Sequence, residues 1–128
     1  MDFVSKQFEF KAGARCIVIG EIGVNHNGDA ELLFRLIDEG VRAGLDVIKL
    51  QRFNAALEIS QHAELADYQS AAGITGNQLK MAQQLELSDD VLFKAFDYCK
   101  EKGVGFLCTA FEHESVDFLA RRASRRPL

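Results

Sequence analysis

Four polar side chains interrupt three otherwise apolar segments of this sequence. They are Glu21, Lys49, Gln51 and Thr109. Because side chains alternate across a strand, the two in the middle segment share a face, and each segment turns polar towards its C-terminal end. Strands of a parallel sheet are covered on both faces, so a charged side chain there costs stability unless it is paired or lies in a polar cleft. Ligands bind at the C-terminal edge of such sheets, so we expect a binding or catalytic site at this edge.

An ion pair between Glu21 and Lys49 is the structural alternative to a ligand site. Glu and Lys are seldom fully buried without a partner, and these two would lie on adjacent parallel strands. Both interpretations stay open on the residues alone. Thr109 by itself is an ordinary strand residue.

The segment 25–29 reads Asn-His-Asn-Gly-Asp and is rich in turn formers. Its structural interpretation is a β-to-α turn with Gly28 at positive φ and Asp29 as the cap of the next helix. Its functional interpretation places Asn25 and His26 at the mouth of a site, with helix-start amides available to an anion. The histidine spacings contain no i, i+4 pair and predict no metal site. Nucleotide-binding glycine motifs and GxSxG are absent from the sequence, so neither nucleotide binding nor serine hydrolysis is indicated.

The elements that position these residues alternate between strand and helix. Apolar runs predict strands over 17–22, 47–53 and 104–111, followed by a helical stretch over 114–119. A strand, helix, strand sequence with such connections is a βαβ unit with parallel strands and a right-handed crossover. We therefore expect an α/β fold of parallel βαβ units, preceded by a short β-hairpin around 11–15.

Two amphipathic helices are predicted between the strands. Asp29 caps the first, which ends before Gly44, and Ser88 caps the second, which ends before Gly103. The second connection is longer than a βα unit needs, because residues 54–87 form an insertion with a short helix near its end. Such an insertion is either a functional lid or a surface excursion with no task.

Composition bounds the class of protein. The chain has 128 residues, 48% hydrophobic and 27% charged, as in one soluble globular domain. The formal net charge is −4, and four of the 15 Lys and Arg fall within residues 121–128, so the acidic body argues against nucleic acid as a partner. Three cysteines without a disulfide or CxxC spacing favour a reducing, cytoplasmic location. No apolar stretch reaches the roughly 18 residues of a membrane span, so no membrane partner is expected.

Several short motifs occur in order along residues 17–119. They read GEIGVNHNG from Gly20, DEGVRAGLDVIKLQRF over 38–53, QLKMAQQLELS over 78–88, YCKEKG over 98–103, FLCTAF over 106–111 and ESVDFL over 114–119. Together they resemble the N-terminal part of the sialic acid (N-acetylneuraminate) synthase family. This resemblance implies a TIM (β/α)8 barrel, of which the chain would form about the first three strands.

The resemblance also implies a reaction and roles for the polar residues. Family members would condense phosphoenolpyruvate with an N-acetylmannosamine-type sugar to give a nonulosonic acid and phosphate. Glu21 is similar to the glutamate of the family's EIG motif, and it would be catalytic by orienting sugar hydroxyls or the attacking water. Lys49, also implied as catalytic, and Thr109 match phosphate-binding positions, and Gln51 would face the sugar.

Further properties follow only from the resemblance. Asn25 and His26 match the NH of the family motif and would shape the sugar end of the site. A divalent metal, Mn or Mg, is implied as cofactor, with its ligands outside this chain, and the full-length protein is implied to be a homodimer. Related substrates, as in legionaminic, pseudaminic or spore-coat sugar pathways, are equally compatible with the motifs.

The chain also departs from the family pattern. Leu50, Arg52 and Ala110 stand where the family more usually has an aromatic residue, Thr and Pro, and Arg52 would point to the helix side. A complete barrel needs about 250 residues. We therefore expect residues 1–120 to be a truncated piece of the barrel, inactive alone, followed by an Arg-rich tail over 121–128. The alternatives are a catalytically dead phosphate or sugar-binding module and a nonfunctional fragment.

Overall fold

Three parallel strands form the sheet in the computed structural model, which describes residues 13–59 and 77–124. They are β1 (Ile19–Gly23), β2 (Val47–Arg52) and β3 (Gly105–Ala110), in the spatial order β1-β2-β3. Both neighbouring pairs are parallel, with Glu21 opposite Lys49 and Gln51 opposite Thr109. The prediction of parallel βαβ units is therefore confirmed.

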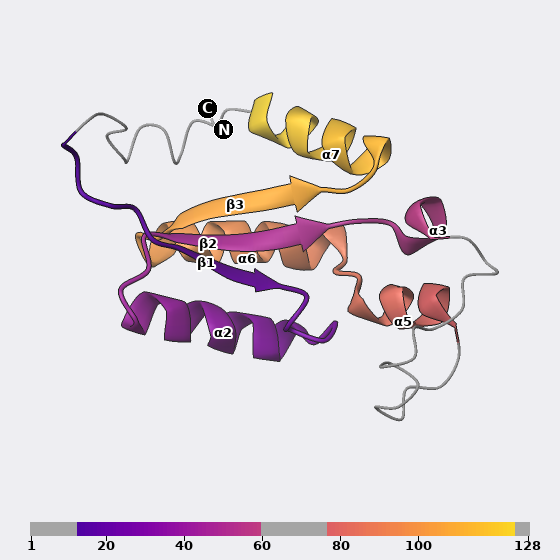
Figure 1. The fold of residues 1–128 in the computed structure, drawn as a ribbon, viewed down its shortest axis with the longest axis horizontal. Helices are drawn as coiled ribbons and strands as arrows, with labels where there is room; N and C mark the ends of the chain where they lie inside the picture. The colour runs from indigo at the N-terminus through magenta and orange to yellow at the C-terminus, as the bar shows by residue number, and fades with distance from the viewer. Residues whose placement is uncertain (1–12, 60–76, 125–128) are drawn as a thin grey trace.

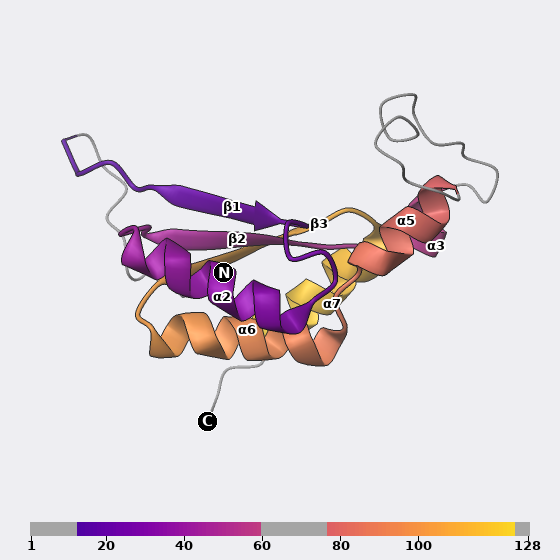
Figure 2. The ribbon, with the colours of Figure 1, turned by 90° about the horizontal axis from the view of Figure 1, so that it is seen from below.

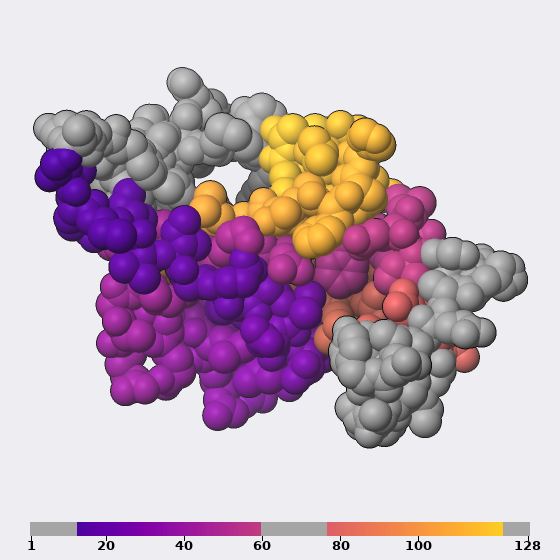
Figure 3. All heavy atoms as spheres, in the orientation of Figure 1, coloured from indigo at the N-terminus to yellow at the C-terminus, as the bar shows by residue number. Residues whose placement is uncertain are grey.

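Three long helices cover one face of this sheet. They are α2 (Ala30–Arg42), α6 (Asp89–Glu101) and α7 (His113–Ser124), and Figure 2 shows all three on the same side of the strands. Two shorter helices, α3 (Ala55–Glu58) and α5 (Gln78–Leu85), lie beyond the carboxyl ends of the strands (Figure 1). In the part of the chain that the structure describes, no helix covers the second face, onto which Figure 3 looks.

The hydrophobic core lies between the sheet and the helices. Its fully buried members include Leu33 and Ile37 of α2, Ile48 and Leu50 of β2, and Cys99 of α6. Because side chains alternate along a strand, burial of Ile48 and Leu50 against the helices places Lys49 and Gln51 on the open face.

Side-chain caps and glycines set the bounds of α2 and α6 as predicted. Asp29 Oδ1 accepts hydrogen bonds from the amides of Glu31 and Leu32, at 2.8 and 3.2 Å, and Ser88 Oγ accepts one from the Val91 amide. These acceptors satisfy amides of the first turn that have no partner inside the helix. Each helix ends just before a glycine with positive φ, as expected from Gly44 and Gly103.

The first strand begins later than predicted. Residues 14–18 form no strand, and β1 begins at Ile19 rather than at residue 17. The reason is that the Val18 amide donates to the Asp46 carboxylate, 2.8 Å away, while the Val18 carbonyl accepts from the amides of Asp46 and Val47. The first arm of the predicted hairpin lies outside the described residues.

The last helix is longer than predicted. It continues to Ser124 instead of ending at Leu119, so the segment expected as a tail begins inside α7. Ala and Arg have high helix propensity, so Ala120, Arg121, Arg122 and Ala123 favour this continuation. The described helices include none long and apolar enough to cross a membrane.

Candidate functional site

Glu21 and Lys49 meet on the open face of the sheet. They are opposite each other in the parallel register, and Lys49 Nζ donates a hydrogen bond to Glu21 Oε2. Their side chains are 42% and 33% exposed, so the pair is open to solvent. An ion pair of this exposure adds only about 0.2–1 kcal/mol to stability. The ion pair foreseen as the structural alternative therefore exists, and its exposure leaves Lys49 accessible to a competing anion.

A bulge at the end of β1 brings the Gln51 amide to the same place. The register shifts between Glu21 and Gly23, where φ is +56°. A Cβ atom at Gly23 would lie 3.2 Å from both Gln51 Nε2 and Glu21 Oε1. The absence of a side chain at Gly23 therefore leaves the space in which the carboxylate and the amide converge.

The third strand adds a hydroxyl to this face. Thr109 is opposite Gln51 in the register, and Leu107 is opposite Lys49. The intervening Cys108 is associated with the core, and burial raises its pKa to about 12. The charges of Arg52 and Lys49 favour its thiolate and that of Glu21 opposes it, but these effects are smaller than that of burial. Cys108 is a protonated thiol near the site and not a nucleophile.

The structure separates the two residues of the predicted turn. Asn25 is exposed, whereas His26 is completely buried. His26 Nδ1 accepts a hydrogen bond from the Gly28 amide, 3.0 Å away, and Nε2 has no hydrogen-bond partner. Burial lowers the pKa of His26, and the nearby Gly23 carbonyl only partly opposes this shift. The neutral imidazole therefore holds the β1–α2 turn, in which Gly28 has the predicted positive φ and Asp29 caps α2.

Helix α5 packs directly against this turn. Gly28 has φ +75°, and a Cβ atom there would lie 2.1 Å from the backbone carbonyl oxygen of Gln84. Asn27 also has a positive φ, of 52°. The end of the predicted insertion thus lies at the edge of the sheet where the strands end, next to the loop that carries Asn25.

A cluster of charged and polar side chains, which the sequence did not reveal, lies behind the site. We call Arg52, Asp89, Glu112 and Ser115 the Arg52 cluster. Arg52 points to the helix side, as its position in β2 indicated, but its partners are far away in the sequence. The sequence placed Arg52 on this face, but nothing in the spacing identified the residues it contacts.

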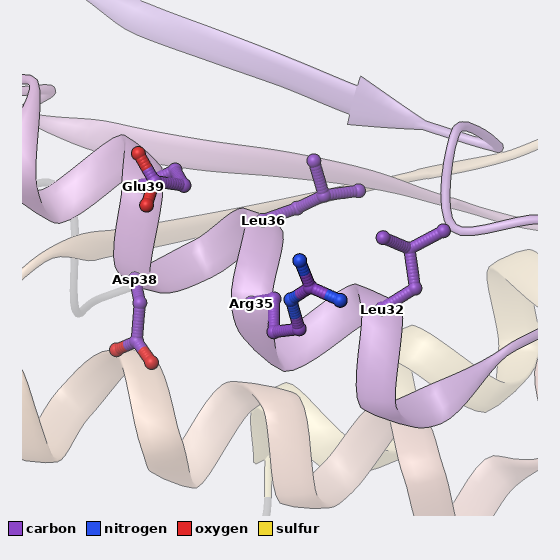
Figure 4. Close-up of a pocket in the computed structure, with 5 residues that line it drawn as sticks. All are labelled: Leu32, Arg35, Leu36, Asp38 and Glu39. Carbon is purple, nitrogen blue, oxygen red and sulfur yellow. The ribbon is translucent and has the colours of Figure 1, made fainter.

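Among the residues that the structure describes, no metal centre accompanies this site. Across residues 13–59 and 77–124, no group of three or more His, Cys, Asp or Glu side chains could hold a metal ion. A hollow of about 330 Å³ is lined by Leu32, Arg35, Leu36, Asp38 and Glu39. Figure 4 shows that all five project from one helix, α2, so none of them lies on the strands that carry Glu21, Lys49, Gln51 and Thr109. It therefore takes no part in the candidate site.

Comparison with known proteins identifies the ancestry of this arrangement. The model of the NeuB family matches residues 36–125. Two N,N'-diacetyllegionaminic acid synthases are similar in sequence: that of Legionella pneumophila is 34% identical over 87% of the chain, and that of Campylobacter jejuni 39% identical over 82%. Each alignment covers 32% of the relative, so the chain spans about a third of their length.

Solved structures give the same fold. The N-acetylneuraminic acid synthetase of Leptospira borgpetersenii superposes with a TM-score of 0.66 at 23% identity, covering 82% of this chain and 32% of that one. The spore coat polysaccharide biosynthesis protein SpsE of Bacillus subtilis gives 0.61 at 29% identity, covering 87% and 28%. The three βαβ-linked strands are thus part of a barrel of this type, as predicted.

Proposed function

The chain belongs to the NeuB family, which includes sialic and legionaminic acid synthases, and we propose that it supplies the first part of a synthase active site. The reaction is the condensation of phosphoenolpyruvate with an N-acetylmannosamine-type sugar to give a nonulosonic acid and phosphate. One observation carries this proposal: Glu21, Lys49, Gln51 and Thr109 occupy one open face at the carboxyl ends of three parallel strands.

Lys49 and Thr109 suit the phosphate ester of phosphoenolpyruvate. An ammonium group neutralises a phosphate oxygen and a hydroxyl donates to one, and hydrogen bonds to charged groups are the stronger kind. Lys49 is now paired with Glu21, so a bound phosphate would compete with the Glu21 carboxylate for the ammonium group. Binding would thereby free Glu21 to accept a hydrogen bond from substrate or water.

Glu21 and Gln51 suit the sugar and the attacking water. In the condensation, the methylene carbon of phosphoenolpyruvate bonds to the aldehyde carbon, whose oxygen takes up a proton. Water then adds to the carbon that bears the phosphate ester, and phosphate leaves with the cleavage of the C–O bond. The Glu21 carboxylate can orient that water or a sugar hydroxyl, and the Gln51 amide can both donate and accept.

The divalent ion that the family resemblance implies, Mn or Mg, would polarise the aldehyde in a complete protein. The described residues offer no group that fits it, so no step of this chain is assigned to the ion. Accordingly we propose that the 128 residues bind phosphoenolpyruvate but do not condense it without the remaining two thirds that the relatives contain. A catalytically dead binding module and a nonfunctional fragment are the competing descriptions.

Calorimetric titration with phosphoenolpyruvate tests this proposal. We expect binding by the 128-residue chain, weakened about tenfold or more in Lys49→Ala, because a charge-assisted contact is lost. Lys94→Ala is the matched control, since Lys94 lies on α6 with its side chain 64% exposed and pairs only with Asp90 among the ion pairs of the described residues. Equal affinity in Lys49→Ala and the parent chain would remove the proposed site.

A condensation assay, read together with the titration, distinguishes an active synthase and a nonfunctional fragment from a chain that only binds. Phosphoenolpyruvate, a divalent ion and N-acetylmannosamine are supplied together, and the nonulosonic acid is sought by mass spectrometry. Product would show an active synthase, binding without product fits the proposal or a dead module, and no binding favours a nonfunctional fragment. Repeating the assay with other N-acylated hexosamines would distinguish a sialic acid precursor from a legionaminic acid precursor.

We also propose a location and an assembly for the protein. Cys16, Cys99 and Cys108 are free thiols, which supports a reducing compartment such as the cytoplasm. We further propose that a complete family member is a homodimer acting on small molecules. The net charge of −4 gives no support for a nucleic-acid partner.

A further inference from the structure

Arg52 connects the end of β2 to two helices on the covered side of the sheet. Its side chain is only 12% exposed. Nη1 donates to Ser115 Oγ, 2.5 Å away, while Nε and Nη2 donate to Asp89 Oδ1 at 3.3 and 3.1 Å. The guanidinium also lies 4.0 Å from the centre of the Phe118 ring. A planar guanidinium with several donors suits such a multiple contact better than an ammonium group would.

Glu112 joins the same cluster to the loop that follows β2. Its side chain is 10% exposed, and its Oε1 accepts hydrogen bonds from the hydroxyl and the amide of Ser115. Its other oxygen, Oε2, accepts from the Asn54 amide, 3.3 Å away. Arg52 Nη1 lies 3.7 Å from Glu112 Oε1. Burial alone would raise the pKa of Glu112, but these hydrogen bonds outweigh it and lower the pKa, which keeps the carboxylate charged.

The segments that directly follow β2 and β3 are also joined in a second way. The Phe111 amide donates to the Arg52 carbonyl, 3.3 Å away, which continues the β2–β3 ladder beyond Ala110. The rings of Phe53 and Phe111 then meet edge to face, with centroids 6.2 Å apart. The segments directly after Gln51 and Thr109 are therefore held by the Arg52 cluster and by an aromatic contact.

We propose that Arg52 is a positioning residue: through Glu112 and Ser115 it fixes the segments after β2 and β3, and so fixes the placement of Gln51 and Thr109. No substrate contact by Arg52 is involved. The consequence for ligand binding rests on the proposed function, whereas the fixing of the two segments does not. The two parts are therefore tested separately.

Hydrogen exchange of the 128-residue chain tests the structural part. In Arg52→Met, which keeps the aliphatic stem, the amides of Asn54 and Ser115 should exchange about tenfold faster or more. The amides of Ile48 and Leu50, in the middle of β2, should change by less than about twofold. A uniform increase at all amides would make Arg52 a general stabiliser, and no increase at Asn54 and Ser115 would equally overturn the proposal.

Two further variants make the result specific. Arg42→Met is the control, because Arg42 forms an exposed pair with Glu39 on α2, and it should leave both groups of amides unchanged. Glu112→Gln keeps the shape of the acceptor but removes its charge, and it should speed exchange at the same two amides. If Arg52→Met does not fold, Arg52→Lys carries the test with the same overturning results, because it keeps the charge but loses the planar set of donors.

Titration with phosphoenolpyruvate tests the consequence for the site. The affinity should fall about threefold or more in Arg52→Met at a temperature where the variant is folded, and Arg52→Lys should restore part of it. An unchanged affinity in Arg52→Met would refute the link between Arg52 and the site. Absence of binding by the parent chain would instead refute the proposed function, and the exchange result would still decide whether Arg52 holds the two segments.

Discussion

Substitution of Gly28 by alanine tests whether α5 packs on the β1–α2 turn. Gly28 and Gly44 have nearly the same backbone conformation, with φ of +75° and +79°. A Cβ atom at Gly28 would lie 2.1 Å from the Gln84 carbonyl oxygen, whereas at Gly44 it would meet nothing within 4 Å. Gly44→Ala is therefore a matched control that has the backbone strain without the collision.

The expected loss of stability follows from the backbone strain and from the collision. An alanine in the left-handed region costs about 1–2 kcal/mol, and this cost is common to both variants. Since real Cβ contacts are essentially never shorter than 3.0 Å, the turn or α5 must move by roughly 1 Å in Gly28→Ala, and overpacking of this kind costs about 1–3 kcal/mol. We expect Gly28→Ala to lower the free energy of unfolding by about 1–3 kcal/mol more than Gly44→Ala.

Urea denaturation followed by circular dichroism measures this difference. The loss of a glycine also restricts the unfolded chain, but this effect is equal in the two variants and cancels in the comparison. The slopes of unfolding free energy against urea should be the same, so the midpoints report stability directly. If the two variants lose the same stability within about 0.5 kcal/mol, α5 does not pack on the turn and the reasoning fails.

Three further predictions concern buried groups. Burial lowers the pKa of His26 from its ordinary 6.5, so below about pH 6.5 the unfolded chain binds a proton that the folded chain does not. The free energy of unfolding should therefore decrease as the pH is lowered below about 6.5. In urea titrations at several pH values, His26→Asn should flatten this dependence. Burial raises the pKa of Cys108 to about 12, so iodoacetamide should alkylate Cys108 about a hundredfold or more slower than the exposed Cys16 at about pH 8. Mass spectrometry follows the two rates, and equal rates would contradict the burial of Cys108. Leu33→Ala should cost about 2–5 kcal/mol, whereas Leu57→Ala, at a position 58% exposed, should stay within about 0.5 kcal/mol; similar losses in thermal unfolding would argue against the core as described.

Most elements of the fold could be predicted because their signals are local. Apolar runs identified the three strands, and the Asp29 and Ser88 side chains mark the starts of α2 and α6 through hydrogen bonds to amides two or three residues away. Helix α3 was not predicted, since its four residues are too few to show a helical period. The start of β1 also depends on Asp46, whose contact with Val18 spans 28 positions in the sequence.

The parts of the site that side-chain alternation and parallel strand register determine could be predicted from the sequence. Glu21 and Lys49 were expected on one face of adjacent strands, and the structure pairs them. The bulge that lets Gln51 approach Glu21 arises from backbone geometry at Gly23, which the residue type permits but does not require. The contacts of Arg52 span 37 and 63 positions, and no pattern in the sequence relates such distant residues.

The most direct test of the central claim is to locate phosphoenolpyruvate on the chain. Amide chemical shifts of the 15N-labelled, 128-residue chain would be followed during a titration with this compound. The account predicts that the shifts concentrate at the carboxyl ends of the strands, at Glu21, Lys49, Gln51 and Thr109, and that Lys49→Ala needs about tenfold or more of the compound to reach the same shifts. Shifts at the opposite edge of the sheet, near Arg15 and Asp46, or no shifts at all, would contradict it.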